Sequence, residues 1–192
     1  MKFIRQACVP RSEVLQSDLQ DSIFAADFGH VLEGPGGVAA EVYKDPEKFF
    51  RNTYPTTTLK KIVTTIFGRL ADPGEAGAAL RLSTGFGGGK THTLIALWHL
   101  GNHVQNLTLG TELLPAAGRP GEVVVAGIDA GKFGVPVCAT HGSTQTRSLW
   151  GELAYQLGGE AAYQAIQAMD DASSLPDSKT VRAMLPEEPL LI

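Results

Sequence analysis

The chain has 192 residues, of which 43% are hydrophobic and 19% charged, so it is long and apolar enough to fold around a core and is not a disordered chain. Its net charge of −4 gives no electrostatic basis for direct nucleic-acid binding by this segment. The only cysteines, Cys8 and Cys138, favour a reducing compartment over a disulfide scaffold. No run approaches the roughly 20 apolar residues of a membrane helix. We therefore expect a cytoplasmic protein without membrane contact.

Residues 1–44 are predicted to form an N-terminal extension with short helices. Asp45 and Pro46 then have the features of a helix start, because an acidic N-cap precedes a proline at the first helical position. This helix is expected over residues 47–54. A longer helix follows, capped by the threonines at 56–58, and its apolar residues recur at helical spacing: Leu59, Ile62, Val63, Ile66, Phe67 and Leu70.

The functional prediction depends on the glycine-rich stretch 82–93, which reads Leu-Ser-Thr-Gly-Phe-Gly-Gly-Gly-Lys-Thr-His-Thr. The apolar run 78–82 before it is predicted to be the first core strand, and the apolar residues at 94–100 indicate a helix after it. A strand, a glycine loop and a helix in this order are typical of a phosphate-binding P-loop. Glycine permits positive φ and close approach of the backbone to a ligand, and the N–H groups of such a loop bind anions.

The residues predicted to bind the nucleotide are Thr84, Gly85, Phe86, Gly87, Gly88, Gly89, Lys90, Thr91 and His92. Lys90 is expected to reach the β- and γ-phosphates, and the Thr91 hydroxyl to bind Mg²⁺. In the usual spacing, G-x-x-x-x-G-K-[ST], the first glycine would stand at Thr84. The turn is therefore made by Thr84 itself or displaced to Gly85. Phe86, on the crest of the loop, is expected to pack under the nucleotide or against a partner.

A second core strand is predicted over residues 123–128, because this run is continuously apolar like a parallel strand covered on both faces. A helix is then expected to begin at Thr144 or Thr146 and to stop at the glycine pair 158–159. Two further helices are expected, over 160–169 and, capped by Asp177, over 178–185. These elements predict an α/β fold, namely a P-loop NTPase-type parallel sheet with flanking helices.

A magnesium site in such a fold also needs a carboxylate from a neighbouring strand. Asp129 is a candidate because it ends the second strand, but Gly127 interrupts the apolar run and the next residue is not a glutamate that would activate water. The apolar run 190–192 has the form of a strand that leads into the acidic (Walker B) motif. We therefore expect residues 45–192 to be the N-terminal part of a P-loop ATPase domain, truncated before that motif, and prefer an acid after Ile192 over Asp129 as metal ligand. A natural C-terminal edge strand is the alternative.

The string at 83–94, S-T-G-F-G-G-G-K-T-H-T-L, resembles the P-loop of the bacterial and archaeal ATP-binding family catalogued as domain of unknown function 499. The stretches 45–54 and 148–159 are similar to the same family, in the same order. The resemblance covers most of the chain from about Arg11 onward. It implies a large protein around an AAA-like P-loop ATPase core, in which Thr84 is a normal part of the loop.

Proteins of this kind resemble the PglY-type ATPases of bacteriophage-exclusion systems and accompany DNA methyltransferases and helicases in defence gene clusters. The resemblance implies binding of ATP with Mg²⁺, as the N-terminal part of an ATPase in anti-phage defence. The implied partners are the remainder of its own chain and other defence proteins. No catalytic residue is predicted here, because a general base is missing. Two other functions stay open: a switch or scaffold that binds ATP without hydrolysing it, and a P-loop phosphotransferase for a small molecule.

Overall fold

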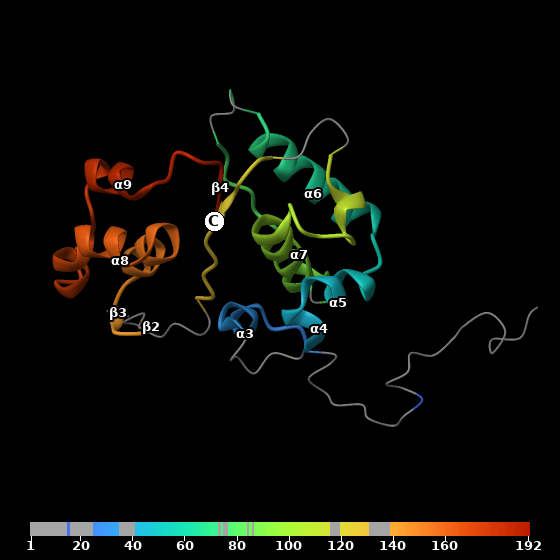
Figure 1. Ribbon diagram of the computed structural model, residues 1–192, viewed down its shortest axis with the longest axis horizontal. Coiled ribbons are helices and arrows are strands. Elements are labelled where there is room, and N and C mark those ends of the chain that lie inside the picture. Colours follow the sequence, from blue (N-terminus) through green and yellow to red (C-terminus); the bar gives the residue numbers. More distant parts are fainter. Residues whose placement is uncertain are drawn as a thin grey trace, which may run out of the picture.

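The computed structural model describes residue 15 and residues 25–34, 41–72, 74, 77–83, 85, 87–115, 120–130 and 139–192. Within these residues the chain is a mixture of helices and small sheets (Figure 1). The elements are, in order, α3 (Phe28–Leu32), α4 (Glu41–Lys44), α5 (Pro46–Arg51), α6 (Thr57–Leu70), α7 (Lys90–His103), the 3₁₀ helix η3 (Thr111–Leu113), β1 (Val124–Val125), β2 (Ala139–His141), β3 (Thr144–Thr146), α8 (Leu149–Asp171), α9 (Ser178–Met184) and β4 (Leu190–Leu191).

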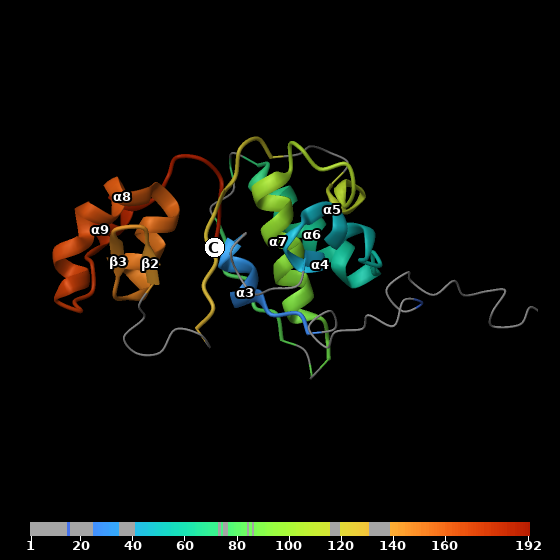
Figure 2. The same ribbon diagram turned by 60° about the horizontal axis from the view of Figure 1, so that its bottom comes forward.

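A two-stranded parallel sheet joins the two halves of the described chain. β1 pairs with β4 so that Val124 lies opposite Leu190 and Val125 opposite Leu191. Successive side chains of a strand point to opposite faces, and the packing follows this rule. Val124 and Leu190 pack against the apolar cluster of α8, whereas Leu191 packs against the cluster that contains α7. The sheet therefore lies between α7 and α8, as both ribbon views show (Figures 1 and 2).

Helix α7 runs antiparallel to β1 at very close range. A Cβ added to Gly101 would lie 2.5 Å from Val125 Cγ2, and one added to Gly127 would lie 3.2 Å from Trp98 Cζ3. Along this contact the helix numbers rise while the strand numbers fall, so the two backbones point in opposite directions. The N-terminal end of α7, which begins at Lys90, therefore lies toward the carboxyl end of β1.

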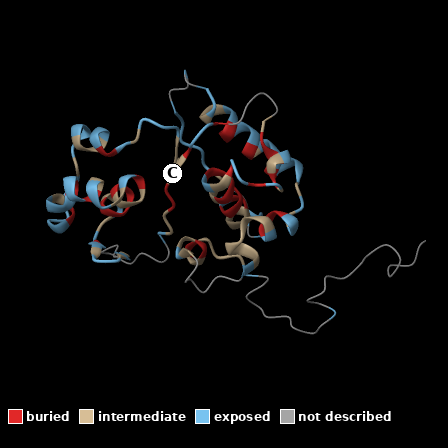
Figure 3. Cartoon of the chain, in the orientation of Figure 1, coloured by how far each residue is buried: buried red, intermediate tan, exposed pale blue. Residues whose placement is uncertain are grey.

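The larger core forms where α5, α6 and α7 pack together, and buried residues line the inner sides of these helices (Figure 3). Their boundaries confirm the local signals in the sequence. Asp45 caps α5 by accepting a 2.8 Å hydrogen bond from the Lys48 N–H, and Pro46 follows at the first position. Thr56 caps α6 by accepting a 3.2 Å bond from the Leu59 N–H. Two elements of the predicted N-terminal extension, α3 and α4, also belong to this part, and the rest of that extension lies almost wholly outside the described residues.

The prediction of a strand over residues 78–82 was wrong for the described structure. This run has no regular strand pairing there, and Leu80 is 54% exposed. A strand needs a neighbour for its N–H and C=O groups, and the ladder of the described sheet is made by β1 and β4 alone. For the same reason the predicted strand over 123–128 is a strand only at Val124–Val125, where β4 supplies partners. The apolar run 190–192 was correctly interpreted as a strand at Leu190–Leu191.

The helix expected from Thr144 or Thr146 begins later, at Leu149. Ser148 is its N-cap and accepts a 3.2 Å bond from the Gly151 N–H. The threonines instead form β3, which pairs with β2 in an antiparallel hairpin closed by a two-residue turn. Gly142 begins that turn at φ 62°, which suits a tight hairpin.

One glycine pair and one N-cap confirm the remaining helix boundaries. Gly158 and Gly159 have non-helical backbone angles and divide α8 into two helical halves. The predicted helix stop at this glycine pair is therefore confirmed. Asp177 caps α9 by accepting a 2.7 Å bond from the Thr180 N–H.

We expect Gly101→Ala to lower the free energy of unfolding by about 1–2 kcal/mol, because the new methyl group overlaps the stiff, β-branched Val125 and outweighs the gain in helix propensity. Gly68→Ala is the matched control, since no described atom lies within 4 Å of a Cβ at this α6 position. It should be neutral or stabilising by up to about 1 kcal/mol. Urea unfolding at constant m-value measures both, and equal stabilities of the two variants would contradict the close contact.

Candidate functional site

The glycine loop makes a tight turn directly before α7. Gly87 and Gly89 have φ angles of 76° and 74°, in the left-handed region that favours glycine. The Gly88 N–H donates a 3.2 Å hydrogen bond to the Gly85 carbonyl and closes the turn. Thr84 and Phe86, which the sequence also assigns to the loop, lie outside the described residues.

The Lys90 side chain lies across this turn. Its Nζ donates a 3.1 Å hydrogen bond to the Gly85 carbonyl oxygen, so the positive charge is held over the loop. Gly89 is the N-cap of α7 and offers no side chain to satisfy the first N–H groups of the helix. No described atom lies within 4 Å of a Cβ added at Gly85, Gly87 or Gly89. The loop thus presents helix N–H groups and one ammonium group that no described side chain covers at these glycines, an arrangement that suits an anion.

His92 lies in the first turn of α7, as predicted, but its ring packs sideways against α5. The ring centroid is 4.5 Å from that of Phe49, and Nε2 is 2.9 Å from Thr53 Oγ1. The Thr53 hydroxyl donates to the Phe49 carbonyl at 2.7 Å, so it accepts from His92, whose Nε2 carries the proton. Burial lowers the pKa of His92. The imidazole is therefore neutral at neutral pH, and Lys90 supplies the charge beside the loop.

The two predicted magnesium ligands, Thr91 and Asp129, come from different parts of the described structure. Thr91 lies partly buried in the first turn of α7, next to the loop. Asp129 lies beyond the carboxyl end of β1 and lines an open cavity of about 800 Å³, together with Trp98, His141 and Glu152 among others. Among the described residues, neither Lys90 nor Thr91 lines this cavity. The antiparallel packing of α7 on β1 still orients both predicted ligands toward the same end of the sheet.

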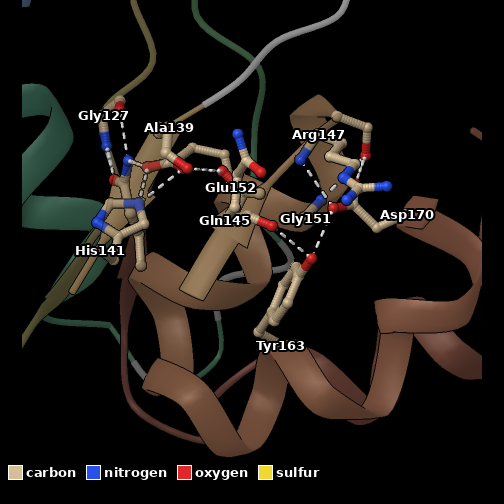
Figure 4. Close-up of polar contacts among 12 residues, drawn as sticks. Gly127, Ala139, His141, Gln145, Arg147, Gly151, Glu152, Tyr163 and Asp170 are labelled. Atoms are coloured by element: carbon tan, nitrogen blue, oxygen red, sulfur yellow. Dashed lines mark hydrogen bonds and ion pairs between the residues drawn. The ribbon is translucent and has the colours of Figure 1, made fainter. Parts of the chain in front are cut away.

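A buried carboxylate that the sequence analysis missed lies beside this cavity. Glu152 on α8 is 2% exposed, and Thr146 Oγ1 and Gln156 Nε2 each donate a 2.7 Å hydrogen bond to it. His141 Nε2 lies 2.9 Å from its Oε2 (Figure 4). Burial alone would raise the pKa of Glu152, but the hydrogen bonds from Gln156, His141 and Thr146 together hold it below its ordinary value. Glu152 therefore ties the β2–β3 hairpin to α8 as a carboxylate.

The same network reaches the segment that leads from β1 to Asp129. The Gln156 side-chain amide donates to the Gly127 carbonyl at 3.0 Å and accepts from the Gly127 N–H at 2.8 Å. Glu152 in turn holds Gln156. The hairpin, α8 and the carboxyl end of β1 are thus connected by side-chain hydrogen bonds, which fix the backbone two residues before Asp129.

A second buried carboxylate, Asp170, holds the far side of the hairpin. It accepts hydrogen bonds from the Arg147 N–H at 2.8 Å, from the Ser148 hydroxyl, and from the Tyr163 hydroxyl at 3.0 Å (Figure 4). Burial and the hydrogen bond to Asp170 raise the pKa of Tyr163 to about 12. Gly151 leaves the room for this carboxylate, because an added Cβ would lie 2.5 Å from it. In the sequence, the one signal for this contact was the presence of a glycine, Gly151, within the stretch 148–152.

Two further features, a metal cluster and a membrane-spanning helix, concern only the part of the chain that the structure describes. Within it, no group of three or more His, Cys, Asp or Glu side chains is arranged to hold a metal ion. Among these described residues there is also no helix with the length and apolar content needed to cross a membrane.

The fold and the loop together define a mixed helix-and-strand protein with a glycine-rich loop at the start of a long helix. The model of the DUF499 N-terminal domain matches residues 1–117, which is more than half of the chain. The chain therefore belongs to the DUF499 family. The match includes the glycine loop and α7, whereas the similar stretch 148–159 lies beyond it. No curated protein and no solved structure matches the chain.

We expect Glu152→Gln to lower the free energy of unfolding at pH 7 by about 1–3 kcal/mol, because an amide cannot accept all three hydrogen bonds. The folded-state pKa of Glu152 is lowered, so its carboxylate stabilises the fold above the unfolded pKa, and this contribution is lost as the pH falls through the folded pKa. The difference between wild type and variant should therefore shrink in acid.

Glu160→Gln is the control, because Glu160 is exposed on the same helix. Denaturant unfolding from pH 7 down to pH values below the ordinary Glu pKa of about 4.3 measures all three proteins. A Glu152→Gln deficit that is constant over this range would show that the carboxylate charge is not the stabilising feature.

Proposed function

We propose that this chain binds ATP with Mg²⁺ through its glycine loop. The observation that carries the proposal is the arrangement of the Lys90 ammonium group over a turn with two left-handed glycines, directly before a 14-residue helix. A purely structural turn needs glycine only where φ is positive, as at Gly87 and Gly89, whereas the glycines at 85 and 88 have no positive φ and still cost conformational entropy on folding. A loop that admits phosphate oxygens requires them, since a Cβ would occupy the space.

Each group has a defined physical role in this proposal. The N–H groups of residues 87, 89 and 90 and the positive end of the α7 dipole stabilise the phosphate charge. Lys90 leaves the Gly85 carbonyl and pairs with the phosphates as a mobile point charge. The Thr91 hydroxyl is the metal ligand nearest the loop, and Thr84 and Phe86 complete the loop. Magnesium, when bound, neutralises phosphate charge.

Asp129 is proposed as the carboxylate on the metal side of the site. Its position at the carboxyl end of a parallel strand supports this role, because ligands of open α/β sheets bind at that end. The oxygen chemistry of Thr91 and Asp129 also fits Mg²⁺, which prefers hydroxyl, carboxylate and phosphate oxygens. The proposal covers binding of the nucleotide, and hydrolysis is not a part of it.

The biological role is proposed from family resemblance alone. A P-loop NTPase fold, an AAA-like parent protein and a function in bacterial anti-phage defence are proposed because the stretches 45–54, 83–94 and 148–159 are similar to the DUF499 family, whose proteins resemble PglY-type ATPases. DNA methyltransferases and helicases of the same defence systems are the proposed partners. The short parallel sheet between α7 and α8 supports the α/β part of this proposal.

The direct test is the binding of Mg-ATP to wild type and to Lys90→Ala, measured by isothermal titration calorimetry. Loss of a charged hydrogen-bond donor costs about 1.5–3 kcal/mol, so we expect affinity to fall by about 10- to 100-fold. Lys61→Ala is the matched control, because Lys61 is an exposed lysine on α6. Equal affinities of wild type and Lys90→Ala would refute the assignment of the loop.

A further inference from the structure

The cavity of about 800 Å³ lies where several elements of the fold meet. Its walls come from α3, α7, the segment after β1, the hairpin strand β2 and α8. Because α7 and α8 lie on opposite sides of the short sheet (Figures 1 and 2), the cavity is lined from both sides. Its volume is within the range of small-molecule sites, about 300–1,000 Å³. The cavity is therefore a candidate ligand site that is separate from Lys90 and Thr91 of the glycine loop.

One wall of this cavity holds an imidazole ring in a fixed orientation. His141 Nε2 lies 2.9 Å from Glu152 Oε2 and 3.1 Å from Oε1 (Figure 4). A carboxylate can only accept, so Nε2 carries the proton and donates to Glu152. The His141 ring also stacks on Tyr155, with ring centroids 4.1 Å apart and an interplanar angle of 11°. The hydrogen bond and the stack together fix the ring before a ligand arrives, which lowers the entropy cost of binding.

The second nitrogen of the His141 ring is an open hydrogen-bond acceptor. With the proton on Nε2, Nδ1 keeps its lone pair. Among the described residues no donor contacts this atom, and the side-chain atom that is buried there without a partner is Nδ1 of His99 instead. The His141 side chain lines the cavity and is 27% exposed. Its Nδ1 is therefore available to an N–H donor of a ligand.

The rest of the lining favours a positively charged, flat ligand. Trp98 from α7 and Tyr155 from α8 supply aromatic surface, and tryptophan is the side chain with the strongest cation–π attraction. Glu152 adds a negative charge behind the imidazole. Glu33 and Asp129 also line the cavity, whereas no lysine or arginine of the described residues does. A phosphate or carboxylate ligand would therefore meet like charge, and a cation would meet opposite charge.

We infer that this cavity binds a small organic cation with a planar guanidinium or amidinium group, which donates an N–H to His141 Nδ1 and packs its face on the aromatic wall. Such a group is weakly hydrated, stacks on aromatic rings and donates in its own plane, so it can use both features of the lining at once. A metal ion does not suit the same lining, because within the described residues no three His, Cys, Asp or Glu side chains converge to hold one. The inference is independent of the nucleotide binding proposed for the glycine loop.

The experiment titrates the full 192-residue chain with three probes by isothermal titration calorimetry. Benzamidine and agmatine have planar N–H cations, whereas phenyltrimethylammonium is a cation without N–H groups. His141→Phe keeps an aromatic ring beside Tyr155 but removes Nδ1, so it should weaken benzamidine and agmatine about 10- to 100-fold and change phenyltrimethylammonium less than about 2-fold. His103→Phe is the matched control, because His103 ends α7 outside the cavity lining. Lys90→Ala should bind all three probes like wild type.

Backbone amide chemical shifts of the wild-type protein make the test independent of the folding of any variant. Benzamidine should shift the amide resonances of residues 139–141 and 152–156, which include the cavity lining, and leave those of residues 87–93 unchanged. Three results would each overturn the inference. They are a wild type that binds neither benzamidine nor agmatine at millimolar concentration, amide shifts that lie outside the cavity lining, and a His141→Phe variant with an unchanged thermal melt that binds benzamidine like wild type or loses all three probes equally.

Discussion

The close contact between α7 and β1 is the constraint on which the rest of this structure depends. Gly101 allows the helix to approach the strand at a distance that a methyl group would not permit, and Gly127, which follows β1, lies close to Trp98 of the same helix. The approach fixes α7 antiparallel to β1 and so sets Lys90 at the end of the sheet where Asp129 follows the strand. The conformation of the loop depends on neighbouring residues. Its position relative to any side chain at the end of the sheet depends on this one packing contact.

Two buried carboxylates perform a comparable task for the second half of the chain. Glu152 and Asp170 each accept several hydrogen bonds, which offsets the cost of burying their charge. Because hydrogen bonds are directional, they select one arrangement of the hairpin on α8, whereas apolar contacts alone permit several. The extension through Gln156 to Gly127 carries that order to the strand end. The geometry around Asp129 therefore depends on residues that are far from the glycine loop in the sequence.

Much of the helical structure was predictable from the sequence because its causes are local. The caps Asp45, Thr56 and Asp177 and the apolar periodicity of α6 act within one or two turns of helix, so neighbouring residues suffice to predict them. The glycine loop and its helix were predicted for the same reason. The strands were harder, since a strand exists only where another segment supplies its hydrogen bonds. Residues 78–82 have strand-like composition and no ladder in the described structure, while Thr144–Thr146 formed one with β2.

The sequence by itself determined the loop, the start of α7 and the family to which the chain belongs, because these are properties of contiguous residues. Only the tertiary structure decided what surrounds the loop. It joined Thr53 to His92 across 39 positions, aligned Val124 with Leu190, and buried Glu152, a carboxylate that the sequence analysis had missed. These contacts depend on which helix packs on which strand. That choice is made by shape and hydrogen bonding between distant segments, which periodicity and spacing do not record.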